Sequence, residues 1–507
     1  MNTTTHKEKF YWQQWVPITV ILLLATGLYF YNIGTESMWN EELYSVNDTK
    51  VKISLFRVRP IYYIVLKFWM LFGTSDSWLR SLSVVFGLGS VFLIYQLGRR
   101  VAGEVTGLIA ALLLALSPLF INFAQMVRMY SLSTCLAIGG SLALVYTLEN
   151  PTNSSMAWWA CTRALMNMTA PLNASLLLPD ILIFCLKFRK QRDVLLRFGK
   201  WALVGLVLWF PSLWVLLSSK FFNFLLPALN ISNKVNISDV DISYVRHRFP
   251  SLVEVIRKLR HLTAFPFPST SKAISLFYQA YTIILLFLLS FGLIKKHRSG
   301  KLLWIAAWAF IPATMIFLVS QRLWIDRYLL FLSPYILILL AAGFMRLWNW
   351  QRTVAIVVAI IYLIAVTNGL VRYYTVQDRQ DWRGLAQVIS AIEKPGDKIV
   401  LSIDSDKMTT ALTHYYHGIA PIYRNPEICS TAKVNKTDLE VELSNLLPIE
   451  RLWLVCHNDF DRTFFEKTFG EQLKVEKHWA FTNEQFYREK DLMHLFLATP
   501  NSNRYLQ

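Results

Sequence analysis

Most of this chain consists of apolar runs long enough to cross a lipid bilayer, with short polar loops between them. A transmembrane helix needs about 20 mainly apolar residues, and runs near that length recur through the first three quarters of the 507 residues. Backbone polar groups in a bilayer must bond within their own segment, so such runs fold as helices. The mean hydropathy of +0.37 is also too high for an ordinary soluble enzyme. The sequence therefore predicts a polytopic α-helical membrane protein.

We expect about 11 transmembrane helices. The candidate spans are residues 16–33, 78–98, 105–123, 129–148, 156–172, 174–188, 201–219, 273–294, 302–320, 328–345 and 353–371. The first run lacks a small-residue cleavage site, so it is expected to be a retained helix and not a signal peptide. Pro171 and Pro179 interrupt the region 156–188, which could be divided differently.

The basic residues predict the orientation of these helices. Basic segments occur at Lys7 and Lys9, at Arg99 and Arg100, and in residues 187–200, 295–301 and 346–352. All of them fall on one side if eleven helices alternate, and short basic loops mark the cytoplasmic side. We therefore expect a transmembrane domain of residues 1–371, with a cytoplasmic N-terminus and an external first loop at 34–77, and an external domain of residues 372–507.

The polar tail is long enough to have a small core of its own. Residues 381–393 have helical periodicity, 395–404 read as a turn followed by a β-branched strand, 449–457 read as a second strand, and 461–470 are helix-like. Helices that alternate with strands indicate a small α/β domain.

The net charge of +18 does not indicate a nucleic-acid-binding protein. Most Lys and Arg residues lie in short loops between spans, where they set the topology, and no nucleic-acid motif is present. The five cysteines show no metal-ligand spacing, and we expect neither a metal nor a cofactor. Cys429 and Cys456 could pair if the tail is exported.

Two adjacent acids follow the first apolar run, in the stretch GTESMWNEELYSVNDTK at residues 34–50. Carboxylates beside an apolar surface are costly unless they are used or paired. Glu41 and Glu42 would point about 100° apart on a helix, so they cannot both face one way. One can act as a general base while the other is held by an Arg or an amide. The alternative is that both acids mark a solvated helix end.

Several cations lie where the topology does not require them. The predicted external segment 220–272 contains Arg246–Arg248 (RHR), Arg257 and Arg260, and Arg327 begins the tenth span on the same side. These residues either form a solvated face or bind an anion at the membrane surface. For Arg327, a salt bridge with Asp326 is the alternative to binding a lipid phosphate.

Four segments together resemble one family of membrane enzymes. The segments are SMWNEELYS at residues 37–45, residues 59–83, residues 97–132 and DRYLLFLSP at residues 326–334. They resemble the polyprenyl-phosphate-dependent glycosyltransferases of the C-type fold, in particular the bacterial family 39 form of the protein mannosyltransferase and aminoarabinose transferase superfamily. The resemblance implies that a sugar moves from a polyprenyl-phosphate donor to a hydroxyl acceptor on the external, periplasmic face of a bacterial inner membrane.

The resemblance and the charge pattern together predict the site residues. The family's first loop usually carries a Trp, one further residue and then Asp-Glu, and Trp39, Asn40, Glu41 and Glu42 occupy these places here. We expect catalytic roles for Glu41 and Glu42. The predicted ligands of the donor phosphate and lipid are Arg128, Arg257, Arg260, Arg327 and Tyr328, and the predicted substrate-binding residues are Trp39, Tyr62, Tyr63 and Tyr130.

The chain also departs from the family pattern. Val58-Arg59-Pro60 stands where the family often has His-Pro-Pro, and Met126 replaces a second acid. These losses keep open a catalytically silent relative that binds a lipid-linked sugar or a partner enzyme. A lipid or glycan transporter is a further alternative. It would predict internal repeats and ionisable groups at mid-membrane, but no convincing repeat is present and the central parts of most spans lack charges.

Overall fold

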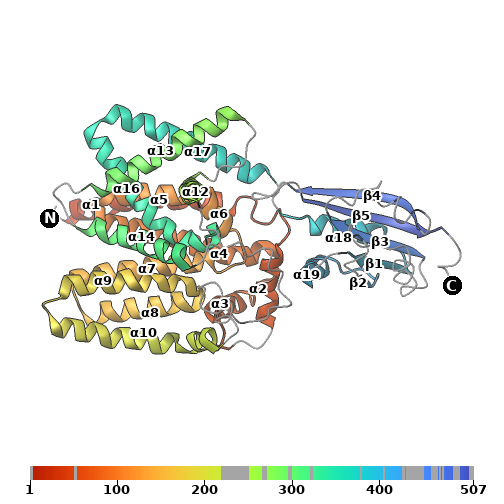
Figure 1. The fold of residues 1–507 in the computed structure, drawn as a ribbon, viewed down its shortest axis with the longest axis horizontal. Helices are drawn as coiled ribbons and strands as arrows, with labels where there is room; N and C mark the ends of the chain where they lie inside the picture. Colours follow the sequence, from red (N-terminus) through yellow and green to blue (C-terminus); the bar gives the residue numbers. More distant parts are fainter. Residues whose placement is uncertain are drawn as a thin grey trace. The chain divides into compact units, whose positions relative to one another are not determined.

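The computed structural model describes residues 4–50, 54–218, 251–264, 271–294, 300–319, 324–376, 379–402, 406–424, 429, 450–457, 466, 470, 473–483 and 491–501. The chain divides into two compact units (Figure 1). The helical unit contains Met1–Ile33 and Asp48–Tyr373, and the sheet unit contains Gly34–Asn47 and Tyr374–Gln507. Helix α2 (Asn40–Lys50) begins in the sheet unit and ends in the helical unit.

The helical unit is a bundle of long helices with several short helical segments between them. Its helices are α1 (Thr4–Phe30), α3 (Pro60–Trp69), α4 (Asp76–Ala102), α5 (Glu104–Ala115), α6 (Pro118–Ala124), α7 (Tyr130–Glu149), α8 (Asn153–Thr169), η1 (Pro171–Leu176), α9 (Leu177–Phe188), α10 (Arg192–Ser218), α12 (Leu252–Thr263), α13 (Lys272–Leu293), α14 (Lys301–Val319), α15 (Asp326–Leu329), η4 (Leu330–Leu332), α16 (Ser333–Trp350) and α17 (Arg352–Thr375).

Eight helical segments in the described part of the chain are long and apolar enough to cross a membrane, so the protein is an integral membrane protein. A ninth is obtained if α5 and α6, which meet at a bend of 65°, count as one broken span. The bend has a local cause, because Pro118 begins α6 and the Ser117 hydroxyl caps it by accepting a hydrogen bond from the Phe120 N–H. The apolar part of α1 covers only Trp15–Phe30, so the count of eleven remains a prediction.

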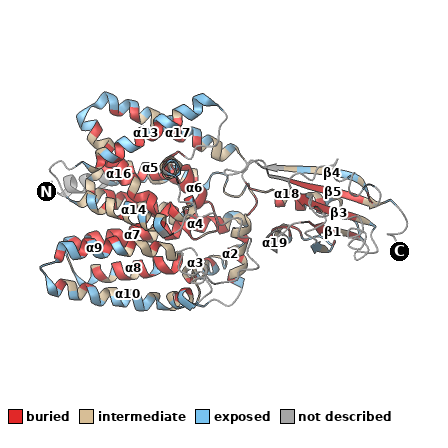
Figure 2. Cartoon of the chain, in the orientation of Figure 1, coloured by how far each residue is buried: buried red, intermediate tan, exposed pale blue. Residues whose placement is uncertain are grey.

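Burial separates central helices from peripheral ones. The most apolar stretch of Asp326–Trp350 is 78% buried, whereas that of Arg192–Ser218 is only 17% buried (Figure 2). Glycines allow α13 and α16 to pack closely. A Cβ added to Gly343 would lie 2.0 Å from the Leu288 carbonyl oxygen, and one added to Gly292 would lie 2.5 Å from that of Leu339. Small residues at such crossings are typical of helix packing in membranes.

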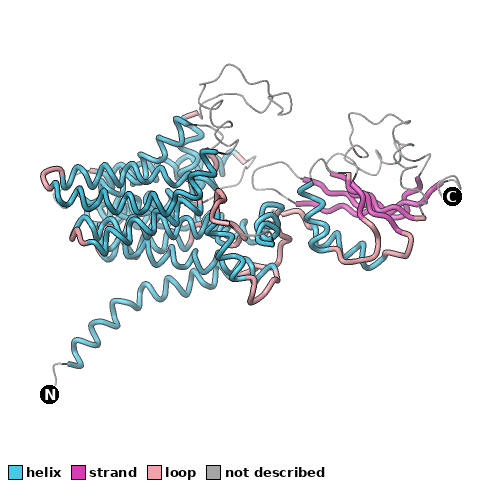
Figure 3. Tube along the Cα trace, turned by 90° about the horizontal axis from the view of Figure 1, so that it is seen from below, coloured by secondary structure: helices cyan, strands magenta, loops and turns pink. Residues whose placement is uncertain are grey.

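The sheet unit confirms the predicted small domain of helices and strands. Its elements are β1 (Asp397–Leu401), β2 (Ile422–Arg424), β3 (Arg451–His457), β4 (Leu473–Asn483), β5 (Asp491–Pro500), α18 (Trp382–Ile392) and α19 (Asp406–Tyr415). The strand order is β2-β1-β3-β5-β4, with β2, β1 and β3 parallel and with β5 antiparallel to β3 and β4. Helices α18 and α19 lie along one face of the sheet (Figure 3).

The elements predicted in the tail are recovered as α18, β1 and β3. The Asp381 side chain caps α18 by accepting a hydrogen bond from the Gly384 N–H at 2.9 Å. The antiparallel pair β4 and β5 was not predicted, and most of the predicted helix at 461–470 lies outside the described residues. Cys429 and Cys456, which were left as a possible pair, form a disulfide with their Cα atoms 5.8 Å apart.

Candidate functional site

The two acids of the first loop have different surroundings within the sheet unit. Glu42 is fully buried, and its Oε2 accepts a hydrogen bond from the Trp39 N–H at 3.0 Å. The same oxygen lies 3.2 Å from Nη1 of Arg379, which is also buried and pairs with Glu36 at 3.3 Å. A Glu at the third helical position that bonds back to the residue before the helix is one half of a capping box. Glu42 therefore holds the start of α2.

Glu41 occupies the neighbouring position and is only half-buried. Its backbone carbonyl accepts a hydrogen bond from the Ser45 hydroxyl at 3.2 Å. Burial, and after it the negative charge of Glu41, raises the pKa of the Tyr44 phenol. The charge of the Glu41 carboxylate thus affects Tyr44, whereas the Glu42 carboxylate bonds to Trp39 and Arg379. The two acids have different neighbours because adjacent residues of a helix point in different directions.

The loop before α2 is anchored to the helices of the sheet unit. The Ser37 hydroxyl donates to Asp381 Oδ1 at 3.3 Å and accepts from the Arg383 N–H at 3.1 Å. The Met38 N–H donates to the Tyr415 hydroxyl at 2.7 Å. These contacts join residues more than 340 positions apart, so no local sequence signal could have revealed them.

Two polar atoms next to Glu41 are buried without a hydrogen-bond partner in the described parts of the chain. They are the indole Nε1 of Trp39 and the amide Oδ1 of Asn40. Buried polar groups in folded proteins are nearly always bonded, so such atoms are candidates for contacts with a ligand. One atom is a donor and the other an acceptor, and they belong to the two residues that precede Glu41 in the chain.

The helical unit brings together four of the predicted residues: Tyr62 and Tyr63 of α3, Arg128, and Tyr130 of α7. The rings of Tyr62 and Tyr63 have centroids 6.0 Å apart, and the guanidinium carbon of Arg128 lies 5.9 Å from the Tyr130 ring centroid. Tyr63 and Tyr62 also act electrostatically on Arg128. We call these four residues the tyrosine–arginine cluster.

Charges around the tyrosine–arginine cluster shift its pKa values. Burial tends to lower the pKa of Arg128, but Tyr130 and Tyr63 raise it and prevail. Burial also raises the pKa of Tyr63, against the charges of Arg128 and Arg59 and with the help of Asp48. The Arg128 guanidinium therefore stays charged at every physiological pH.

Sequence reasoning missed Arg59 and Asp48 as members of this site. Arg59 Nε is buried and has no hydrogen-bond partner among the described residues, while its Nη1 lies 4.0 Å from the Met129 sulfur. The available signal was the departure from His-Pro-Pro, which was interpreted as the loss of a His and not as the gain of a cation. Met126, in the place of the second acid, is buried.

A second basic cluster surrounds the start of α15. Asp326 is buried, with its carboxylate 2.7 Å from Lys258 Nζ and 3.1 Å from His261 Nδ1, both on α12. Asp326 thus joins the start of α15 to α12 through Lys258 and His261. The Arg327 guanidinium carbon lies 5.1 Å from the ring centroid of Tyr328, and both side chains are half-buried.

Helix α12 also carries the predicted cations Arg257 and Arg260. Arg257 is exposed and Arg260 is half-buried. Burial, and then the positive charge of Arg257, lowers the pKa of Arg260. Two like charges this close are stabilised by a bound anion. Arg246 and Arg248 lie outside the described residues.

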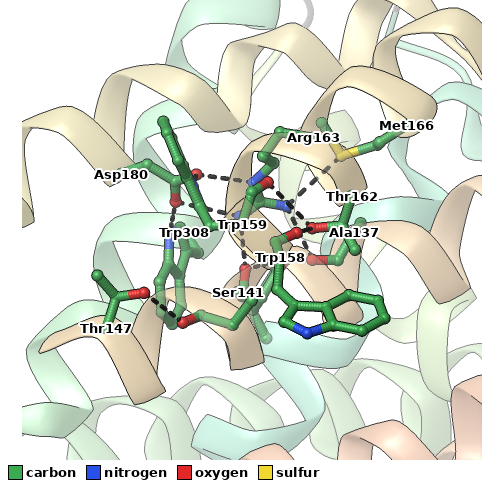
Figure 4. A network of polar contacts seen from close by, with 12 residues as sticks. Ala137, Ser141, Thr147, Trp158, Trp159, Thr162, Arg163, Met166, Asp180 and Trp308 are labelled. Carbon is green, nitrogen blue, oxygen red and sulfur yellow. Dashed lines mark hydrogen bonds and ion pairs between the residues drawn. The ribbon is translucent and has the colours of Figure 1, made fainter. Parts of the chain in front are cut away.

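A buried ion pair that sequence reasoning missed lies in the middle of the helical unit (Figure 4). Arg163 of α8 and Asp180 of α9 are 2% and 0% exposed, and Arg163 Nε lies 2.7 Å from Asp180 Oδ2. Trp159 and Trp308 each donate an indole N–H to Asp180 at 2.7 Å. The pair is therefore fully bonded, and it ties α8 and α9 to α14.

The rest of this network joins α7 and α16. Arg163 donates to the Ala137 carbonyl at 2.9 Å and to the Ser141 hydroxyl at 2.8 Å, and Ser141 contacts the Tyr335 hydroxyl at 2.8 Å. Intramembrane charges usually mark function, but every charged atom here has a protein partner. The network accordingly has a structural role. Within the described residues, no group of three His, Cys, Asp or Glu side chains could hold a metal ion.

Parts of the sequence match a known family and a known protein. Residues 60–215 match the family described as dolichyl-phosphate-mannose-protein mannosyltransferase. An uncharacterized protein of Aquifex aeolicus is 30% identical over 122 residues, which is 21% of this chain and 24% of that protein. The chain thus matches about a quarter of this relative's length.

Solved structures resemble nearly the whole chain. ArnT from Cupriavidus metallidurans in the apo state has a TM-score of 0.54 at 12% identity, covering 95% of this chain and 97% of that one. The undecaprenyl phosphate complex of the same protein has a TM-score of 0.52 at 12% identity, with 94% and 97% covered. The apo oligosaccharyltransferase of Archaeoglobus fulgidus has a TM-score of 0.52 at 11% identity, with 94% and 75% covered. The predicted fold is therefore confirmed: this chain has the C-type glycosyltransferase fold of these solved structures.

Proposed function

We propose that the protein is a membrane glycosyltransferase that moves a sugar from a polyprenyl-phosphate carrier to a hydroxyl acceptor. The acceptor oxygen attacks the anomeric carbon, the bond from that carbon to the phosphate oxygen breaks, and the anomeric configuration inverts. The polyprenyl phosphate departs as an anion, and the proton of the acceptor hydroxyl passes to a carboxylate of the protein. Phosphate is a good leaving group, so the step needs no general acid.

The difference in burial and bonding between Glu41 and Glu42 is the observation that carries this proposal. Glu42 is buried and committed to Trp39 and Arg379. Glu41 is half-buried, and in the two residues before it Trp39 Nε1 and Asn40 Oδ1 have no hydrogen-bond partner in the described part of the chain. We assign Glu41 as the general base and Glu42 as the residue that positions it.

Cations of the helical unit are the proposed ligands of the phosphate groups. Arg327 and the α12 pair Arg257 and Arg260 are assigned to the phosphate of the donor, because cations aimed at a leaving phosphate stabilise its developing charge. The tyrosine–arginine cluster is assigned to the substrate, with Arg128 as a further phosphate ligand. Aromatic rings provide the flat apolar surfaces on which sugar rings pack.

The proposed setting is the external face of a bacterial inner membrane. The charge distribution of the loops supports a cytoplasmic N-terminus and a periplasmic sheet unit. The disulfide between Cys429 and Cys456 supports the same orientation, because disulfides persist in the periplasm and are rare in the cytosol.

A deletion strain tests the proposal in the cell. Mass spectrometry of its surface glycans and lipids should reveal a lost sugar, which the parent gene restores and Glu41→Gln does not. Glu36→Gln is the matched control, because Glu36 is a nearby acid of the same loop, and it should restore the sugar. An unchanged set of surface glycans and lipids in the deletion strain would contradict the proposal.

The buried Met126 favours a second candidate, a silent relative that binds a lipid-linked sugar without transferring it. In purified protein, Arg327→Ala should weaken binding of a polyprenyl-phosphate sugar by roughly ten- to a hundred-fold, since a charge-assisted contact contributes about 1.5–3 kcal/mol. Binding that depends on Arg327, combined with a deletion strain that loses no sugar, would identify the silent relative.

A further inference from the structure

A hollow of about 620 Å³ lies where α4, α7 and α8 come together in the helical unit. Its apolar wall includes Leu93, Gly139, Leu142 and the ring of Trp158, whereas polar residues of the turn between α7 and α8 line the opposite end. Trp158 is 66% exposed, although it is the largest apolar side chain of this wall. The hollow thus has an apolar part, which we call the trough, and a polar end, which we call the mouth.

The hollow is far from the residues assigned to glycosyl transfer. Its polar mouth contains Glu149, the last residue of α7, while Tyr130 of the tyrosine–arginine cluster is the first. Twenty helical residues span about 30 Å, which is the thickness of the hydrocarbon core of a bilayer. The mouth is therefore at the opposite membrane surface from that cluster, the surface predicted to be cytoplasmic.

Arg100 and Glu149 line this mouth, and two further cations, Lys301 and Lys187, lie close to Glu149 without lining the hollow. Glu149 lies 2.6 Å from Nη2 of Arg100 and 2.6 Å from Nζ of Lys301. Lys187 donates a hydrogen bond to the carbonyl of Leu148, the residue before Glu149, and Glu149 and Lys301 both act electrostatically on it. Arg100 also covers the ring of Tyr146, with its guanidinium carbon 4.3 Å from the ring centroid. The formal charge of this group of four ionisable side chains is +2, so Glu149 orders the cations without neutralising them.

We propose that this hollow is a binding site for an anionic phospholipid. The phosphodiester occupies the mouth beside Arg100 and Lys301, and one acyl chain follows the trough along Gly139, Leu142 and Trp158. The topology rule accounts for cations on this surface, but it does not require them to gather around one carboxylate at the end of an apolar trough. A headgroup with a single negative charge complements the excess charge of the mouth, and an exposed indole is suited to this depth of the bilayer.

Native mass spectrometry of the purified full-length protein tests the site, with phosphatidylglycerol and phosphatidylcholine as probes. The parent protein should retain phosphatidylglycerol more strongly than phosphatidylcholine. The double variant Arg100→Gln, Lys301→Gln should weaken phosphatidylglycerol binding about ten-fold and leave phosphatidylcholine binding unchanged. The control Lys190→Gln, Arg192→Gln removes two exposed cations near the same surface that neither line the hollow nor belong to the group around Glu149, and it should bind phosphatidylglycerol like the parent.

A second pair of variants tests the trough without altering any charge. A Cβ added to Gly139 would lie 3.8 Å from Leu93 Cδ1, an ordinary contact, so Gly139→Leu fills the trough without a clash at Cβ. Gly199→Leu is the matched control, because it has the same change in a helix interior with no atom within 4 Å of the added Cβ. Gly139→Leu should reduce phosphatidylglycerol binding about ten-fold and Gly199→Leu should not. Equal binding of the two lipids by the parent, or parent-like binding by Gly139→Leu, would overturn the proposal even if the charge variant failed to fold.

Discussion

One carboxylate oxygen of Glu42 receives both the backbone N–H of Trp39, at 3.0 Å, and the guanidinium of Arg379, at 3.2 Å. The first contact fixes where α2 begins, and the second ties that beginning to the segment just before α18. Glu41 is the residue immediately before Glu42, so the conformation of its backbone depends on these two bonds. Catalysis by Glu41 therefore requires a stable loop.

Replacing Glu42 should damage the loop more than replacing its neighbour. Glu42→Ala removes the acceptor of the Trp39 N–H, which costs about 1 kcal/mol for a helix cap, and removes one partner of buried Arg379. Limited proteolysis of the purified protein should therefore show faster cleavage within residues 34–50. Glu41→Ala, the same change one position earlier, should be cleaved like the parent. Equal resistance of Glu42→Ala and the parent would show that Glu42 does not hold α2.

Replacing only one member of the buried pair Arg163 and Asp180 should destabilise the protein. Arg163→Met leaves Asp180 as a buried carboxylate with only two indole donors, and breaking a buried pair in this way costs about 3–5 kcal/mol. The thermal unfolding midpoint in detergent should fall by several degrees. Arg163→Met combined with Asp180→Asn removes both charges and should recover part of the loss. A single variant as stable as the parent would refute the structural role of the network.

The sheet unit should lose stability in acid. Burial would raise the pKa of Asp397, but hydrogen bonds from Arg451 and Trp453 outweigh it and hold that pKa below its usual value of 3.8. A carboxyl group with a depressed folded-state pKa stabilises the fold above its unfolded pKa, and this contribution disappears as the pH falls through the folded value. Asp397→Asn should therefore lower the unfolding midpoint at pH 7, and the difference from the parent should shrink below about pH 4. A difference that does not change with pH would contradict this origin.

The disulfide should be closed in protein isolated without reductant. A thiol reagent should then modify only cysteines among Cys135, Cys161 and Cys185, and it should reach Cys429 and Cys456 only after reduction. For a loop of 27 residues, the loss of the bond should destabilise the sheet unit by about 3–4 kcal/mol. Modification of Cys456 in unreduced protein would contradict both the bond and the external location that it supports.

The positions of the transmembrane helices could be predicted because each helix corresponds to a continuous apolar run of the sequence. Each predicted span falls mainly on one helix or on a broken pair, since 18 or so apolar residues allow few alternatives in a membrane. Helix α18 was predicted because its buried residues Trp382, Leu385 and Ile389 repeat at helical spacing. Strand β4 was missed because it is an edge strand in which Lys474, Glu476 and Lys477 are exposed, so its apolar signal is weak.

The candidate site was less predictable because its parts come from distant segments. The acids and tyrosines were found through residue patterns, but the partner of Glu42 is Arg379, 337 positions away. Arg163 and Asp180 were missed because each is a single charge in an apolar run, and only the packing of α8 against α9 shows that they neutralise each other. Arg59 was not predicted because Val58-Arg59-Pro60, which stands in the place of His-Pro-Pro, was interpreted only as the loss of a His.

The turnover of Glu41→Gln decides whether Glu41 is the general base. Gln keeps the size and hydrogen bonding of the side chain but removes the basic oxygen. With the donor and acceptor identified from the deletion strain, purified Glu41→Gln should bind the polyprenyl-phosphate sugar nearly as tightly as the parent while turning over about 10²-fold more slowly or worse. Turnover by Glu41→Gln at the rate of the parent protein would show that Glu41 is not the general base.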